Sequence, residues 1–533
     1  MARAAARLKA GGTSLKVLAG SGVVRPFGPR TLYRLARTVL TWGTGPAGGF
    51  ATLAVRYPDR VGLIDEIGAL TFGELHARSN ALADALKGRG VGEGDGVAVM
   101  CRNHRGFLDA SLAVAKLGAD VLYLNTAFAG PQLVDVLARE KPRIVIHDEE
   151  FTGLLAGAEV ENRILAWVDG QTDEPTLDRL IEAGSRAEHP APQRHSRVII
   201  LTSGTTGTPK GAPRNEAGID AAVSLLSRMP LKHGWTTHIA APLFHTWGYA
   251  HLALSMLLGS TMVLTRRFEP EQSLALTARH RCDSMVVIPV MLQRILNLPE
   301  ETLRRHDLSR LKVVAASGSA LPGDLALNWM DHFGDNLYNI YGSTEIAYAS
   351  IATPQDLRAS PDSAGKPPHA TVVRIFDDAG EPLPVGESGR IFVGNGLLFE
   401  GYTGGGHKEV VDGLMSSGDV GRFDRDGRLH VEGRDDEMIV SGGENVFPRE
   451  VEDCLSRHEL VVEAAAVGVE DPDFGKRLRA FVVTSADIGQ DELKDWVKAN
   501  LARFKVPREI VFLDELPRNA TGKVLKRELA EFS

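Results

Sequence analysis

Short apolar runs rich in β-branched residues recur along the chain, and many of them end in a polar or glycine-rich segment. Examples are "RVIILTSG", "THIAAPLFHTWG", "SMVVIPV", "LKVVAASGSALP" and "NLYNIYGSTE". Segments with helical spacing of apolar residues, such as "LVDVLARE" and "PEQSLALTARHR", lie between them. This alternation predicts an α/β fold with largely parallel sheets. Because ligands bind such sheets at the carboxyl ends of the strands, the polar tails of these runs are the candidate sites.

The pattern changes towards the C-terminus. Turn-forming residues are frequent at Asp377–Arg390, and the strand-like runs "RIFVG" and "RLHVEG" that follow are shorter. The remaining residues read as helix, strand, strand, helix, strand and helix, ending near Glu531, which suits a small separate domain. We therefore expect a large N-terminal domain of layered α/β sheets (residues 51–435) with a β subdomain at about 365–435. A small α+β C-terminal domain (437–533) follows it.

Composition narrows the class of protein. The 533 residues are 43% hydrophobic and carry a net charge of −8, which is typical of a multidomain globular protein and argues against nucleic-acid binding. The three cysteines, Cys101, Cys282 and Cys454, are widely separated, so no metal motif or disulfide framework is visible and a reducing compartment fits. No apolar run reaches the roughly 18 residues that a membrane span needs. A cytoplasmic location is expected.

Residues 1–50 form a basic leader. The first acidic residue is Asp59, whereas eight basic residues precede it between positions 3 and 37: Arg3, Arg7, Lys9, Lys16, Arg25, Arg30, Arg34 and Arg37. Such a stretch is typical of peripheral contact with an anionic membrane surface, of a transit peptide to an organelle, or of a loosely held basic terminus. The sequence leaves these three alternatives open.

The segment "LTSGTTGTPKG" at residues 201–211 has no large apolar side chain between Thr202 and Lys210. Its glycines permit tight turns, and its hydroxyls and single ammonium group suit a ligand with many anionic oxygens. It is not a Walker loop, because Lys210 is followed by Gly211 rather than by Ser or Thr. The predicted polyphosphate loop comprises Thr202, Ser203, Gly204, Thr205, Thr206, Gly207 and Lys210.

Seven motifs follow one another in a characteristic order: "TSGTTGTPKG", "PLFHTWG", "ASGSALP", "YGSTE", "SGD", "GRDDEMIVSGGENVFP" and "PRNATGKVLK". In this order, over about residues 50–530, the chain resembles acyl-CoA synthetases (fatty acyl-CoA ligases) of the adenylate-forming superfamily. The resemblance implies ATP, Mg²⁺ and coenzyme A as cofactor and co-substrates. In the reaction that the resemblance implies, a carboxylate attacks the α-phosphate of ATP to give an acyl-adenylate, and the thiol of CoA then displaces AMP. The resemblance also implies that the small domain is mobile about a hinge at Asp436.

The resemblance assigns roles to individual residues. Glu345 would hold Mg²⁺, Thr344 would contact phosphate, and Tyr341 with Gly342 would lie at the adenine. Asp419 would accept hydrogen bonds from the ribose, with Arg434 as a second contact, although the flanking "DGLMSSGD" departs from the commoner "GW…TGD" form. The backbone that frames adenine would be Gly318, Ser319 and Ala320, and Gly442 and Gly443 would line the pantetheine tunnel.

Two further residues are implied in catalysis. Lys523 would bring its charge to the carboxylate and the α-phosphate, and His245 would lie at the carboxylate end of the acyl pocket, where relatives that activate amino acids carry an acidic residue. Trp247, Gly248 and Met291 are candidate pocket walls. The expected substrate is a medium- to long-chain fatty acid, which the segment "LNTAFAGPQL" favours. The alternatives are an aryl-CoA ligase, a fatty acyl-AMP ligase that loads a carrier protein, and a non-catalytic acyl-adenylate binding protein.

Overall fold

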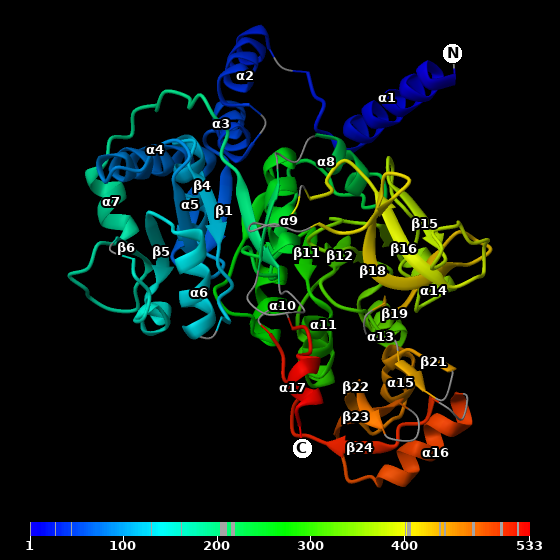
Figure 1. Ribbon diagram of the computed structural model, residues 1–533. Coiled ribbons are helices and arrows are strands. Elements are labelled where there is room, and N and C mark those ends of the chain that lie inside the picture. The colour runs from blue at the N-terminus through cyan, green and yellow to red at the C-terminus, as the bar shows by residue number, and fades with distance from the viewer. Residues whose placement is uncertain are drawn as a thin grey trace.

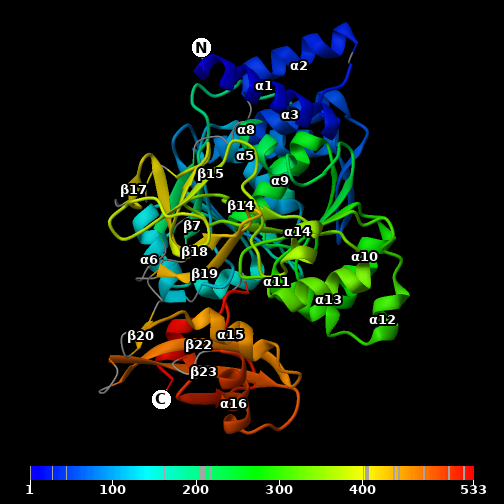
Figure 2. The same cartoon turned by 90° about the vertical axis from the view of Figure 1, so that its right-hand side faces the viewer.

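The computed structural model describes residues 2–532 with the exception of 27, 44, 129, 161, 203–209, 215–218, 400, 402–406, 436–438, 442–443, 472–474, 502–504 and 520–521. A large body of layered sheets and helices carries a small C-terminal domain at one end (Figure 1). Two N-terminal helices lie at the opposite end (Figure 2). The α/β class predicted from the sequence is confirmed.

The first sheet has eight strands in the order β14-β13-β12-β11-β9-β10-β1-β2, parallel except for the antiparallel edge strands β2 and β14. Most residues of its inner strands are buried on both faces, and β11 and β12 are the most apolar, as expected of strands between helical layers. The strands are β1 (Val61–Asp65), β2 (Gly68–Thr71), β9 (Thr236–Ile239), β10 (Thr261–Val263), β11 (Ser284–Val287), β12 (Val313–Ala316), β13 (Leu337–Tyr341) and β14 (Ser350–Ala352). The helices of this part of the chain are α8 (Ile219–Leu226), α9 (Thr246–Leu258), α10 (Pro270–Arg279), α11 (Pro289–Leu296), α12 (Glu300–Arg305), α13 (Gly323–Phe333) and α14 (Pro354–Ala359).

The second sheet has six strands in the order β6-β5-β3-β4-β7-β8, of which only the edge strand β8 runs antiparallel to its neighbour. The strands are β3 (Gly96–Met100), β4 (Asp120–Tyr123), β5 (Ile144–Asp148), β6 (Arg163–Trp167), β7 (Val198–Thr202) and β8 (Lys210–Arg214). The helices in this region are α3 (Pro46–Arg56), α4 (Phe72–Gly88), α5 (Arg105–Lys116), α6 (Gly130–Glu140), the 3₁₀ helix η1 (Glu149–Leu155) and α7 (Leu177–Ala183).

Two more sheets follow. The strands β15 (Val372–Phe376), β16 (Gly389–Gly394), β17 (Val410–Val411), β18 (Leu414–Phe423) and β19 (Leu429–Arg434) form an antiparallel sheet. The C-terminal domain contains β20 (Ile439–Ser441), β21 (Glu444–Val446), α15 (Pro448–Ser456), β22 (Val461–Asp471), β23 (Gly475–Thr484), α16 (Gln490–Asn500), β24 (Glu509–Phe512) and α17 (Lys526–Ala530). From α15 onwards this is the predicted order of elements; the short hairpin β20–β21 is additional. The domain boundaries stay predictions, and the expected hinge Asp436 lies outside the described residues.

The small domain is in direct contact with the large one. The side-chain amide of Gln293 on α11 donates to the carbonyl of Val462 at 2.7 Å, and an Nη of Arg449 donates to the carbonyl of Val431 at 3.0 Å. A longer ion pair of 3.7 Å joins Arg457 to Asp362. These contacts between described residues are polar, as is usual for interfaces between domains of one chain.

The basic leader is helical in the structure. It forms α1 (Ala2–Ser21) and α2 (Pro29–Trp42), joined by a short connection. In the part of the chain that the structure describes, no helix is long and apolar enough to cross a membrane.

Two buried histidines on the core elements predict a pH-dependent stability. Burial lowers the pKa of His238 to about 4 and that of His251 to about 3, below the value of about 6.5 in an unfolded chain. The unfolded chain therefore binds more protons between these values. The stability that depends on these histidines being neutral should be complete above pH 6.5. As the pH drops towards 4, the free energy of unfolding should fall, by about 3 kcal/mol for His238 alone.

Urea unfolding between pH 7 and pH 4 measures this effect. In His238→Asn the fall of the unfolding free energy with acidity should be smaller than in the parent protein. The control His407→Asn changes an exposed histidine and should keep the parental slope. Equal slopes in all three proteins would contradict the assignment.

Candidate active site

The motifs "PLFHTWG", "ASGSALP" and "YGSTE" meet at the carboxyl edge of the eight-stranded sheet. His245 is the N-cap residue of α9, and the next residue, Thr246, hydrogen-bonds through Oγ1 to Oγ1 of Thr344 at 3.4 Å. The indole N–H of Trp247 donates to the carbonyl of Val287 at the end of β11, at 3.0 Å. The start of α9 is thereby fixed between the ends of β11 and β13.

The predicted polyphosphate segment connects β7 to β8. These two strands are antiparallel neighbours, with Thr202 opposite Lys210. The expectation of a loop spanning 202–211 is corrected, because Thr202 ends β7 while Lys210 and Gly211 belong to β8. Ser203, Gly204, Thr205, Thr206 and Gly207 lie outside the described residues.

The turn after β13 is built around Gly342. A Cβ on this residue would lie 2.1 Å from the carbonyl oxygen of Ala347, so only glycine fits where the chain folds back. The turn fixes Glu345 near the sheet edge: the hydroxyl of Ser343 donates to its Oε2 at 2.8 Å and accepts from its backbone N–H at 3.2 Å. A carboxylate oriented in this way, beside the hydroxyls of Ser343 and Thr344, fits the oxygen ligands that Mg²⁺ takes together with phosphate.

Asp419 joins the antiparallel sheet to this edge. It lies opposite Arg434 in the β18–β19 pair, and Nη1 of Arg434 donates to its Oδ1 at 3.4 Å. The hydroxyl of Tyr341 donates to its other oxygen, Oδ2. Burial raises the pKa of Asp419, and the charge of Arg434 and the Tyr341 bond oppose this rise. The sequence predicted that Asp419 and Arg434 both contact the ribose, but it predicted neither their ion pair nor the bond from Tyr341, which was expected to lie at the adenine.

The segment after β12 carries the other adenine-binding candidates. Gly318 has a φ of +102°, which favours glycine, and a Cβ there would lie 3.3 Å from Cγ2 of Ile288. Gly318 and Ala320 are exposed and Ser319 is half-buried. The backbone edge of these three residues is therefore accessible beside the end of β11.

Lys523 reaches the same region from the C-terminal domain. Its backbone N–H donates to Oδ1 of Asn519 at 3.0 Å, which closes a turn. Gly522 in this turn has a φ of +75°, and a Cβ on it would lie 2.6 Å from Cγ1 of Val290 and 3.0 Å from Cδ1 of Ile288. The turn thus packs directly on the end of β11. The Lys523 charge is near enough to Asp419 to oppose the rise of its pKa.

His245 is held as a neutral imidazole. Burial lowers its pKa to about 4. Core packing accounts for the three candidate pocket walls: Trp247 and Met291 are buried, and a Cβ on Gly248 would lie 2.2 Å from the carbonyl oxygen of Pro242. Gly442 and Gly443, predicted for the pantetheine tunnel, lie outside the described residues.

Two residues of the site were not predicted from the sequence, Ser343 and Lys408. Ser343 lies inside "YGSTE", so the motif contained the signal, but the bond to Glu345 follows from the turn geometry. Lys408 lies nine positions before the start of the "SGD" motif, in a stretch without a recognisable pattern. Its Nζ lies 3.2 Å from where a Cβ of Gly418 would be, and its charge also favours the Asp419 carboxylate. No sequence pattern pointed to Lys408.

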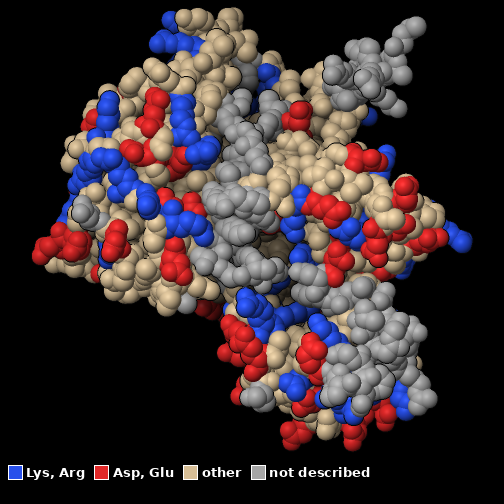
Figure 3. Space-filling view, in the orientation of Figure 1, with Lys and Arg blue, Asp and Glu red and all other residues tan. Residues whose placement is uncertain are grey.

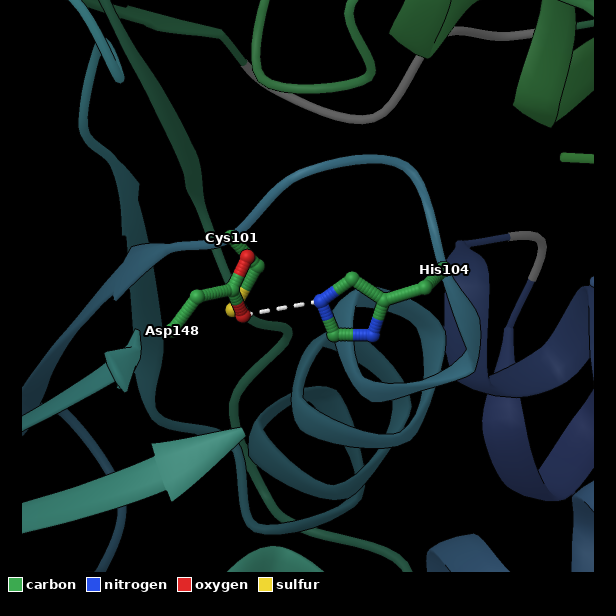
Figure 4. A group of neighbouring side chains, drawn as sticks. All are labelled: Cys101, His104 and Asp148. Carbon is green, nitrogen blue, oxygen red and sulfur yellow. Dashed lines mark hydrogen bonds and ion pairs between the residues drawn. The ribbon is translucent and has the colours of Figure 1, made fainter. Parts of the chain in front are cut away.

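A separate buried cluster has the composition of a metal site. Cys101, His104 and Asp148 offer ligand atoms within 4.8 Å of one another (Figure 4). Nε2 of His104 bonds to Oδ1 of Asp148 at 2.8 Å, and Nδ1 accepts from the N–H of Gly106 at 3.1 Å. Oδ2 of Asp148 accepts from the N–H of Arg102 at 2.8 Å. Burial raises the pKa of the Cys101 thiol well above its usual value. These bonds already use the imidazole and the carboxylate, so the cluster caps α5 and supports the sheet.

Comparison with known proteins agrees with this geometry. The AMP-binding enzyme family matches residues 50–403, and its C-terminal domain family matches residues 450–523. A feruloyl-CoA synthase from Amycolatopsis sp is 35% identical over 473 residues, covering 86% of this chain and 93% of that protein. A 2-succinylbenzoate–CoA ligase from Geobacillus kaustophilus is 33% identical and covers 89% and 95% respectively.

Solved structures show the same likeness. An anthranilate CoA ligase in complex with anthranoyl-AMP has a TM-score of 0.81 at 25% identity, covering 91% of this chain and 96% of that one. The o-succinylbenzoate CoA synthetase from Bacillus subtilis in complex with its acyl-adenylate has a TM-score of 0.80 at 28% identity, covering 91% and 98%.

Fold and site together define an adenylate-forming enzyme. The chain belongs to the AMP-binding enzyme family, as the resemblance predicted. Its activity is the ATP-dependent activation of a carboxylic acid through an acyl-AMP to a CoA thioester, with ATP, Mg²⁺ and CoA.

The Tyr341–Asp419 bond makes a prediction about nucleotide binding. Removing the hydroxyl in Tyr341→Phe takes away a bond that stabilises the Asp419 carboxylate, so the pKa of Asp419 should rise further. If the ionised carboxylate binds the ribose, the affinity for AMP should begin to fall at a higher pH in the variant as the solution is acidified. Calorimetric titration at several pH values measures this, with Tyr338→Phe on the same strand as control. Identical pH profiles would refute the coupling.

Proposed function

We propose that this enzyme converts an aromatic carboxylic acid into its CoA thioester. The single observation that carries the proposal is the convergence of Lys523, Asp419 with Arg434, Glu345 and His245 on one sheet edge. The substrate class rests on the relatives: those named above act on ferulate, 2-succinylbenzoate and anthranilate. Aryl substrates were the second choice from sequence.

The two anions that react in the first step repel each other, so the site must supply positive charge. In this proposal Lys523 draws the carboxylate and the α-phosphate together, and Thr344 with the segment 202–210 binds the phosphates. Asp419 and Arg434 orient the ribose, while Gly318, Ser319 and Ala320 present backbone to the adenine. Glu345 holds Mg²⁺, which supplies additional charge on the phosphates.

The residue type at position 245 supports a substrate without an ammonium group near its carboxylate. A histidine offers no anion to pair with an amino group, whatever its protonation state. Amino acids are therefore disfavoured. The fatty acid expected from "LNTAFAGPQL" is the competing candidate.

The position of the small domain supports the adenylating state. The charge of Lys523 acts on Asp419 while its turn packs on Ile288 and Val290. In this proposal Lys523 serves the first step only, and the small domain moves before the second. The proposal therefore includes rotation about Asp436 before CoA reacts, with Gly442 and Gly443 along the path of the CoA thiol.

All three cysteines are buried free thiols, which supports the predicted reducing, cytoplasmic compartment.

Pyrophosphate release with a panel of acids tests the function. Ferulate, benzoate-type acids, medium- and long-chain fatty acids and an amino acid are compared with and without CoA. Aromatic acids should give the highest kcat/KM and a CoA thioester by mass spectrometry. A preference for fatty acids would overturn the substrate class, and release without thioester would favour a carrier-protein ligase. No release with any acid would favour a binding protein.

Lys523→Ala should separate the two half-reactions. Adenylate formation should fall by about 10²–10³, the usual cost of removing one group that stabilises the transition state electrostatically. Thioester formation from supplied acyl-adenylate should stay nearly intact. The matched control is Lys526→Ala, three residues on, where the ammonium pairs with Glu452 at 2.9 Å inside the small domain. Equal losses in both half-reactions would show that Lys523 has a different role.

A further inference from the structure

The helix α2 has two distinct faces. At 100° per residue its apolar side chains, including Leu32, Tyr33, Val39 and Leu40, share one half of the helix. The other half carries Arg30, Arg34 and Arg37 together with the threonines Thr31, Thr38 and Thr41. The helix contains no acidic residue. It is therefore amphipathic with a purely cationic polar face.

Most of the apolar half of α2 is exposed; the exceptions are the buried Trp42 and the half-buried Leu35. Leu40 is 87% exposed, Tyr33 70%, Leu32 51% and Val39 41%. With Leu15 and Val24, this stretch holds six of the twelve large apolar side chains that are exposed within the described part of the chain. Contiguous exposed apolar groups on one element mark an interaction surface, whereas isolated ones do not.

The helix is nevertheless fixed to the body. Its last residue, Trp42, is buried in a small cluster with Ala47, Ala51 and Ala115, and the N–H of Gly43 caps the helix by donating to the carbonyl of Val39. The outer half is thus presented by a folded, anchored helix rather than by a loose terminus. The family match begins only at residue 50, so the adenylating fold does not account for this helix.

The positive charge of the leader favours an anionic partner. No acidic residue precedes Asp59, and eight basic ones lie between positions 3 and 37, in a protein whose net charge is −8. The visible surface of α2 shows basic and uncharged atoms without acidic ones (Figure 3). Two copies of α2 packed on each other would bring cationic rims together with no counter-charge. An anionic lipid surface offers hydrocarbon for the apolar half and phosphate charge for the arginines.

We propose that α2 binds the surface of an anionic bilayer, lying in the plane of the interface. With 14 residues it is about 21 Å long, too short to span the hydrocarbon core of about 30 Å. The long side chains of the arginines on the opposite half can extend to the headgroups while Leu32, Val39 and Leu40 enter the acyl boundary. This inference stands independently of the acid that the enzyme activates.

The position of α2 is compatible with catalysis on the membrane. Both views place α1 and α2 at the end of the molecule opposite the C-terminal domain (Figures 1 and 2). A membrane contact there leaves the small domain on the solvent side, where it can move between the two steps.

Vesicle sedimentation of the full chain tests the proposal. The protein should pellet with vesicles that contain 30% phosphatidylglycerol in phosphatidylcholine, bind vesicles of phosphatidylcholine alone much less, and be released by salt. The double variant Leu32→Ser with Leu40→Ser should weaken the partition coefficient by about tenfold or more, as should Arg34→Gln with Arg37→Gln. Val385→Ser, an equally exposed apolar residue outside the leader (63%), is the matched control and should bind as the parent does.

Pyrophosphate release in solution should be unchanged in every variant, which shows that each is folded. The proposal is overturned if the parent fails to pellet with anionic vesicles, if neutral vesicles bind equally well, or if the α2 variants bind undiminished. A dimer in light scattering that Leu32→Ser with Leu40→Ser abolishes, without vesicle binding, would assign the face to a second copy instead.

Discussion

The site depends on one close contact between the domains. The turn that carries Lys523 can pack on Ile288 and Val290 only because Gly522 has no side chain and adopts a positive φ. That contact brings a cation from the C-terminal domain to within electrostatic reach of Asp419. Among the described residues, this contact is accompanied by the bond from Gln293 to Val462 and the long ion pair of Arg457 with Asp362, so the charge proposed for catalysis comes from a separate domain.

Burial of Asp419 is the second constraint. A carboxylate removed from water is unstable unless donors and cations surround it, and here Arg434, Tyr341, Lys408 and Lys523 offset part of the desolvation that raises the pKa of Asp419. Tyr341 therefore contributes a donor to the position that ribose hydroxyls are proposed to use. When a nucleotide binds, a ribose hydroxyl can take the place of the Tyr341 hydroxyl at Asp419 at little cost in free energy. The Tyr341 bond therefore holds the carboxylate in position before the nucleotide arrives.

Much of this could be predicted from the sequence. The runs ending in "ASGSALP", "YGSTE" and "PLFHTWG" were placed at strand ends, and they do meet at one sheet edge, because the carboxyl ends of parallel strands converge whatever the order of the strands. The prediction that the loop extends to Lys210 was wrong. Lys210 belongs to strand β8, because pairing with β7 outweighs the preference of the glycine-rich surroundings for a turn. The bond between Tyr341 and Asp419 joins residues 78 apart, and Lys408 lies in a polar stretch with no periodicity. Long-range pairings of this kind leave no mark in a single sequence.

For the basic leader, too, the sequence alone predicted less than the structure shows. Its charge was evident in the sequence, but a count of basic residues does not distinguish a loose terminus from a membrane-binding helix. The distinction requires knowing that the arginines of α2 share one face and that Trp42 fixes the helix while Leu40 remains outside. An anchored amphipathic helix loses less conformational entropy on meeting a bilayer than an unfolded leader would, because its backbone is already ordered. The buried indole at the end of α2 thus increases the affinity that the exposed leucines can provide.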